Sequence, residues 1–189
     1  RIEALRTLRT RNAREVGEPA LAAVCDPDIT VSMVAIDQLA GCGESPAAAT
    51  FLQRAVSDLA DAEAPRNWHR SAHALLALAA AAPEPAAAAL APFLTAKTWQ
   101  LRMYAARAAA ALRLRLPLEQ LARDTDDNVV EAALAALSTL AGHDADRFFI
   151  EALGRDGYQV IRVAARALAA SPAPDAAIPA LRSALLKAE

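Results

Sequence analysis

The stretch Val160–Leu168, VIRVAARAL, contains the pattern that decides the fold. Val160, Ala164 and Leu168 are apolar and four residues apart, so they share one face of a helix with about 3.6 residues per turn. The central alanine recurs every 28 to 37 residues, at Ala4, Ala35, Ala72, Ala105 and Ala133. An apolar residue four positions later completes each stripe, at Leu8, Leu39, Leu76, Ala109 and Leu137. A period near thirty residues is typical of stacked helical repeats.

Each period divides into two helices, of which the second carries the alanine stripe. The second helices are expected at Arg1–Arg9, Ile29–Ala40, Asn67–Ala81, Thr98–Leu112, Asp127–Ala141 and Tyr158–Ala170. The first helices are expected at Glu18–Cys25, Pro46–Leu59, Glu84–Leu94, Pro117–Arg123, Ala145–Gly154 and Pro174–Lys187. Prolines in first turns and aspartates between paired helices support this division, since proline is tolerated there and aspartate can cap the next helix.

No segment alternates like a strand, so we predict an all-α fold without sheets. The stripes predict an α-solenoid of antiparallel helix pairs, with about five full repeats and a half-repeat at each end. Leu101–Ala109, LRMYAARAA, together with Val160–Leu168 and the Asp-Pro at 26–27, resembles HEAT and HEAT-like (PBS-lyase-type) repeats. The resemblance covers nearly the whole chain and implies a single repeat domain over residues 1–189. Because the chain lacks an initiator methionine, we expect it to be a fragment of a longer array or multidomain protein.

The composition limits the partners. The chain of 189 residues is 55% hydrophobic and has a net charge of −2, which disfavours nucleic acid and anionic lipid. No apolar run reaches the roughly 20 residues that span a bilayer. We therefore expect a cytoplasmic protein without membrane association. Cys25 and Cys42 are expected at opposite ends of a helix hairpin, too far apart for a disulfide, and are predicted to be two free thiols.

A candidate binding face follows from the stripes. Positions two and six residues after the first residue of each stripe point away from the core, at about 200° and 240° around the helix. They are Met33, Asp37, Arg70, Ala74, Met103, Arg107, Glu131, Ala135, Arg162 and Arg166. The HEAT resemblance implies that this face lines a concave groove. Its arginines can bind carboxylates through two parallel hydrogen bonds, although a solvated, salt-bridged face or a contact with a nucleic-acid backbone remain alternatives.

Two aromatic residues and two histidines have further interpretations. Trp68 and Trp99 occupy corresponding turns of consecutive repeats and either pack between helices or wall one edge of the groove. HEAT-like DNA glycosylases use Trp with Asp and Arg in such a place. His69 and His73 have the i, i+4 spacing that can bind zinc. No glutamate follows His69 and no third ligand is evident, so we predict neither a metal site nor a cofactor.

The sequence contains no Gly-rich phosphate loop, no nucleophile elbow and no Cys-x-x-Cys pair. We therefore expect a non-enzymatic scaffold that binds a protein or peptide, with an acidic partner as one option. The candidate anchors are Arg70, Trp99, Met103, Tyr104, Arg107, Glu131, Arg162 and Arg166. One alternative is an accessory repeat domain of a larger multidomain bacterial enzyme. Another is a HEAT-like enzyme, such as an alkyl-base DNA glycosylase or a bilin lyase.

Overall fold

A computed structural model describes residues 1–11, 16–42, 45–59 and 68–187. Every regular element within these ranges is helical, which confirms the all-α prediction. The chain divides into two compact units, an N-terminal unit of Arg1–Leu112 and a C-terminal unit of Arg113–Glu189. Each is described by itself, and the predicted single repeat domain over residues 1–189 stays a prediction.

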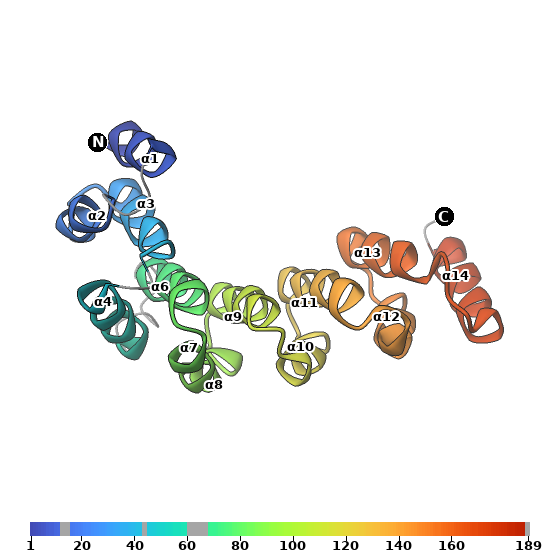
Figure 1. The fold of residues 1–189 in the computed structure, drawn as a ribbon. Coiled ribbons are helices and arrows are strands. Elements are labelled where there is room, and N and C mark those ends of the chain that lie inside the picture. The colour runs from blue at the N-terminus through green and yellow to red at the C-terminus, as the bar shows by residue number, and fades with distance from the viewer. Residues whose placement is uncertain (12–15, 43–44, 60–67, 188–189) are drawn as a thin grey trace. The chain divides into compact units, whose positions relative to one another are not determined.

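The N-terminal unit pairs its helices in chain order. Its elements are α1 (Ile2–Arg11), α2 (Gly17–Ala23), α3 (Ile29–Leu39), α4 (Pro46–Ser57), α6 (Trp68–Ala81), α7 (Pro83–Ala89), α8 (Ala91–Leu94) and α9 (Trp99–Ala111). Helix α3 contacts α1, α2 and α6, while α6 also contacts α4, α7 and α9. Helices α1, α3, α6 and α9 follow one another in a row, with α2, α4, α7 and α8 along the other side (Figure 1).

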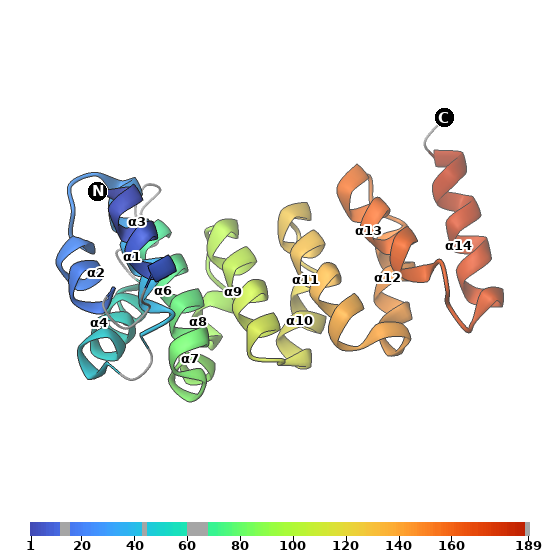
Figure 2. The same cartoon turned by 45° about the horizontal axis from the view of Figure 1, so that its top comes forward.

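The C-terminal unit continues the same alternation. Its elements are α10 (Arg115–Leu121), α11 (Asp127–Leu140), the 3-10 helix η1 (Gly142–Ala145), α12 (Asp146–Ala152), α13 (Tyr158–Leu168) and α14 (Pro174–Lys187). Helix α11 contacts α10 and α13, and α12 contacts α13 and α14. Figure 2 shows α11 and α13 side by side, each with its paired helix beside it.

Helix ends lie close to the expected ones, with one break. The helix expected at Glu84–Leu94 is divided at Leu90 into α7 and α8. Pro92 explains the division, because it has no N–H for the carbonyl of Ala88 and its ring would collide with that carbonyl. The Leu90 amide instead bonds the Ala87 carbonyl at 3.3 Å. Asn67, expected to begin the third of the second helices, lies outside the described residues.

Side-chain caps begin several of the helices as expected. Asp28 and Asp126 each accept a backbone hydrogen bond of 2.9 Å, from Thr30 and Asn128 respectively. These two caps satisfy amides that have no partner inside the helix. The turn before α13 differs, because its N-cap position is Gly157, which has no side chain to accept a hydrogen bond from a first-turn amide.

The alanine stripe is the buried side of the second helices. Ala35, Ala72, Ala105, Ala133 and Ala164 have no exposed surface. Ala4 is exposed, whereas its neighbour Leu5 is buried, so the stripe expected for the first helix is wrong at Ala4. In α1 the larger side chains of Ile2, Leu5 and Leu8 define the apolar face, because burying them removes more apolar area from water than burying one alanine does.

A second correction concerns Ala74, which was expected on the exposed face. It is completely buried, because α6 is packed against α3, α4, α7 and α9 and keeps little free surface. Both cysteines are free thiols, as predicted, with Cys25 exposed and Cys42 buried. In the part of the chain that the structure describes, no helix is long and apolar enough to cross a bilayer.

Ion pairs join the first helices of the C-terminal unit. Arg123, in the turn after α10, donates two hydrogen bonds of 2.8 Å to the Glu151 carboxylate on α12. Arg147 on α12 donates in return to Glu119 on α10 at 3.2 Å. Both guanidinium groups lie over the ring of Phe148, at 4.6 and 4.5 Å from its centroid. Helices α10 and α12 are thus held together by two reciprocal pairs around one buried aromatic ring.

The stripe predicts the effect of enlarging a buried alanine. Ala133→Leu forces three extra carbon atoms into a fully packed position of α11 and should lower the free energy of unfolding by roughly 1–3 kcal/mol. Ala135→Leu makes the same change at an exposed position of the same helix and should leave it nearly unchanged. Urea denaturation followed by circular dichroism compares the two. Equal stabilities would mean that the stripe is not the packed face.

The ion pairs predict a pH effect on stability. A hydrogen bond from Arg115 holds the pKa of Glu119 below its ordinary range, and one from Arg123 does the same for Glu151. A carboxyl whose pKa is lowered by folding stabilises the protein above its unfolded pKa, about 4.3, and stops doing so as pH falls through the folded pKa. The wild type should therefore lose more stability between about pH 7 and pH 3 than the Glu119→Gln, Glu151→Gln double variant. Parallel losses in urea midpoints would contradict this.

Candidate functional site

Three consecutive second helices of the N-terminal unit are connected by a chain of polar side chains. His73 on α6 lies with Nδ1 at 2.7 Å from Oδ1 of Asp37 on α3. Its Nε2 lies 3.0 Å from the hydroxyl of Tyr104 on α9. The carboxylate can only accept, so we place the ring proton on Nδ1, which leaves Nε2 to accept from the Tyr104 hydroxyl. Two hydrogen bonds thus connect α3, α6 and α9.

Aromatic rings and one guanidinium gather around Tyr104. Its ring centroid lies 5.1 Å from that of His73 and 6.0 Å from that of Trp68. Trp68 also contacts His69, at 3.6 Å between ring centroids. The guanidinium carbon of Arg107 lies over the Tyr104 ring, 5.0 Å from its centroid. We call these five residues the Tyr104 cluster: its four rings are half-buried, and Arg107 is exposed.

The pKa shifts of Tyr104 and His69 indicate that both side chains are uncharged at neutral pH. Burial raises the pKa of Tyr104, and this outweighs the opposite effect of the nearby Arg107. Burial and the neighbouring His73 lower the pKa of His69. At neutral pH Tyr104 is therefore a phenol that donates a hydrogen bond, and His69 is uncharged. Arg107 is a fixed positive charge at the exposed side of the cluster.

The Tyr104 cluster does not include the other anchors predicted in the N-terminal unit. Arg70 is exposed, but its guanidinium donates to the carbonyl of Val24 at 3.1 Å and to the Cys25 sulfur at 3.4 Å. It thereby satisfies the end of α2 instead of continuing a row of open arginines. Met103 and Trp99 are half-buried on α9. The ring partners of Trp68 are His69 and Tyr104.

The anchors predicted in the C-terminal unit form a different arrangement. Glu131 on α11 and Arg162 on α13 make an ion pair of 3.6 Å, and both are half-buried. The Nε of Arg162 is buried and, within the described residues, has no hydrogen-bond partner. Arg166 is exposed in the last turn of α13. Within this unit the predicted face therefore presents one paired and one open arginine.

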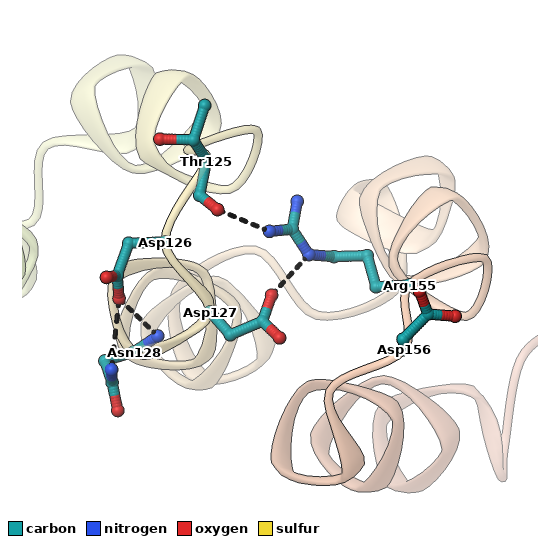
Figure 3. A pocket seen from close by; sticks show the side chains of 6 residues that line it. All are labelled: Thr125, Asp126, Asp127, Asn128, Arg155 and Asp156. Carbon is teal, nitrogen blue, oxygen red and sulfur yellow. Dashed lines mark hydrogen bonds and ion pairs between the residues drawn. The ribbon is translucent and has the colours of Figure 1, made fainter.

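A polar cavity lies between two turns of the C-terminal unit. Its volume is about 580 Å³, and it is lined by Thr125, Asp126, Asp127, Asn128, Arg155 and Asp156. Arg155 donates to the Asp127 carboxylate at 2.7 Å and to the Thr125 carbonyl at 3.1 Å (Figure 3). It also donates to the Asp124 carbonyl at 3.0 Å. These bonds join the turn before α13 to the turn before α11, so we interpret Arg155 as a structural brace.

The sequence pattern gave Arg155 no role beyond its place in a turn between paired helices. The signal that could have found it is an acidic turn at residues 124–127 followed, one period later, by the Arg-Asp-Gly at residues 155–157. Sequence spacing places the two turns in corresponding positions of consecutive pairs. It does not say whether the arginine turns toward the acidic turn or toward solvent.

The histidine pair does not offer two open ligands. Both ring nitrogens of His73 are occupied, by Asp37 and by Tyr104. Among the described residues no group of three His, Cys, Asp or Glu side chains could hold a metal ion. What the cluster supplies instead is hydrogen bonds, aromatic surface and one cation.

Comparison with known proteins finds no protein-family model that matches this chain and no curated protein with a similar sequence.

The brace predicts the outcome of a glycine substitution. A Cβ at Gly157 would overlap the carboxylate of Asp127, which would have to leave Arg155. Gly157→Ala should therefore lower the free energy of unfolding by about 1 kcal/mol, as expected for a strained, partly exposed ion pair. In an Asp127→Ala background the overlap is removed, and Gly157→Ala should be neutral or slightly stabilising. Urea denaturation measures the free energy of unfolding in both backgrounds. If Gly157→Ala lowered it equally in both, the overlap with Asp127 would not be the reason that a glycine is needed at position 157.

Proposed function

We propose that each unit is a stretch of HEAT-like α-solenoid, and that the protein is a non-enzymatic scaffold which binds a protein or peptide through its second helices. The period of the alanine stripe and the contacts of α3 with α6 and of α6 with α9 support the repeat assignment. In such an array binding uses side chains that neighbouring repeats present together. The observation that carries the proposal is the Tyr104 cluster, to which α6 and α9 both contribute.

The composition of the cluster favours an interface. Trp, Tyr and Arg are the residue types that dominate binding energy at protein interfaces. Here Trp68, Tyr104 and Arg107 contact one another in a chain and remain partly or fully exposed. Aromatic rings offer large contact areas and lose little conformational entropy on binding. An exposed group of these three types is therefore a good anchor for a partner.

The rigidity of the cluster supports the same function. The hydroxyl of Tyr104 is held by His73, which is in turn held by Asp37. Side chains that are already ordered before binding reduce the entropic cost of association. The backbone beneath them is the packed row of α3, α6 and α9, whose stripe alanines are completely buried.

The HEAT-like enzyme alternative comes from the HEAT resemblance. The order Asp37, His73, Tyr104 has the form of an acid–base relay, in which a histidine could accept the proton of a nucleophile. Burial raises the pKa of Tyr104, which makes its hydroxyl a poorer nucleophile. The cluster is thus better suited to holding a ligand than to attacking one. An accessory domain of a larger enzyme would use the same face in the same manner.

Charge reversal tests the proposed face. Arg107→Glu changes the exposed cation of the cluster, whereas Arg54→Glu makes the same change on α4, which belongs to the other row of the same unit. Affinity capture with each variant and the wild type, followed by mass spectrometry, compares their partners. We expect Arg107→Glu to lose at least tenfold in capture of the main partners, since charged interface pairs contribute several kcal/mol, and Arg54→Glu to retain them. Full retention by Arg107→Glu would remove this face from consideration.

A further inference from the structure

We infer that the Tyr104 cluster is a carboxylate-binding site for an acidic peptide segment, in which Arg107 contacts the carboxylate and His73 is a positioning residue. This inference rests on the proposed function and names the chemistry of the partner. It assigns the anchoring role to Arg107, in place of the row of arginines expected from the sequence.

Arg107 is placed where it can bind a carboxylate. Its guanidinium lies over the Tyr104 ring at 5.0 Å, three residues further along α9, in the arrangement of a cation–π pair. Arg107 also makes a side-chain hydrogen bond with Tyr104. A guanidinium has more N–H donors than this bond uses, and two that remain can match the two oxygens of a carboxylate. Among the described residues no carboxylate is paired with Arg107, whose side chain is exposed.

The charged side chains around Arg107 already have partners of their own. Asp37 is the acidic side chain that is hydrogen-bonded to the cluster. Its carboxylate accepts from Nδ1 of His73. Arg70 donates a hydrogen bond to the Val24 carbonyl at the end of α2. A segment with one well-placed carboxylate can therefore bind Arg107 without displacing a carboxylate of the described residues from it. A nucleic-acid backbone requires several open cations in a row, and the described residues of the Tyr104 cluster supply one cation, Arg107.

His73 holds the Tyr104 side chain in position. Tyr104 donates to Nε2 of His73 at 3.0 Å, and Asp37 holds the opposite ring nitrogen. These bonds hold the Tyr104 ring in one orientation, and the ring in turn supports the guanidinium of Arg107. His73 need not touch the ligand for this effect, because a preorganised site gains affinity by losing less entropy on binding.

A selection experiment tests the ligand class. The full chain is used to select binders from a display library of random 12-residue peptides, and the best binder is synthesised with and without its acidic residues exchanged, Glu to Gln or Asp to Asn. In fluorescence anisotropy the wild type should bind the acidic form about ten- to a hundredfold more tightly, as expected for charge-assisted hydrogen bonds. Arg107→Gln should bind both forms with nearly equal affinity, and Arg54→Gln should behave as the wild type.

The remaining outcomes separate this inference from the proposed function. Neutral binders that still depend on Trp68 would overturn the carboxylate site and leave the scaffold function standing. A library that yields no binder would overturn both. A single-stranded oligonucleotide that displaces the selected peptide at equal concentration would show that the anion recognised is phosphate, and would also overturn the inference.

Matched variants test His73 as a positioning residue. Gln at position 73 can accept from the Tyr104 hydroxyl through its oxygen and donate to Asp37 through its nitrogen, whereas Leu can do neither. His73→Leu should reduce the preference for the acidic peptide at least threefold, and His73→Gln should restore most of it. Circular dichroism melting checks that both variants fold. If both folded variants discriminate as the wild type does, His73 has no positioning role.

Discussion

The close packing of the second helices along their alanine stripes is the constraint on which the rest of the N-terminal unit depends. Ala35, Ala72 and Ala105 are completely buried, and side chains this small allow neighbouring helix backbones to approach closely. Close approach brings polar side chains of three different helices within hydrogen-bonding distance. The bonds of His73 to Asp37 and to Tyr104 are a direct result, since longer stripe residues would separate the helices that carry them.

The two units use different polar groups between neighbouring helix pairs. In the N-terminal unit the connection is the chain from Asp37 to Tyr104, on the side where the proposed ligand would bind. In the C-terminal unit it consists of ion pairs, with Arg155 bracing two turns and Arg123 joining α10 to α12. A guanidinium that is already bonded to a carboxylate or to several carbonyls has few donors left for a partner. This difference is why we place the proposed binding site on the Tyr104 cluster.

The candidate site was only partly predictable from the sequence. Helical spacing placed Arg107 on the exposed face, and the structure agrees. The same spacing predicted Arg70 as an anchor of the same kind, although its guanidinium donates to the Val24 carbonyl at the end of α2. His73 drew attention as a possible metal ligand, and its actual partners are Asp37 and Tyr104. These partners come from helices more than 30 residues apart, so no spacing within one helix reveals them.

Local sequence patterns are enough to predict the all-α class, nearly all helix positions and five of the buried alanines, because helices form from local hydrogen bonds and show their buried face as a period of about 3.6 residues. Even the break at Leu90 follows from Pro92, a local effect. The same patterns did not reveal that Leu5 is buried in place of Ala4, or that Ala74 is buried. Such details depend on how many helices surround a given one and on their rotation, and these are set by packing between segments distant in the chain.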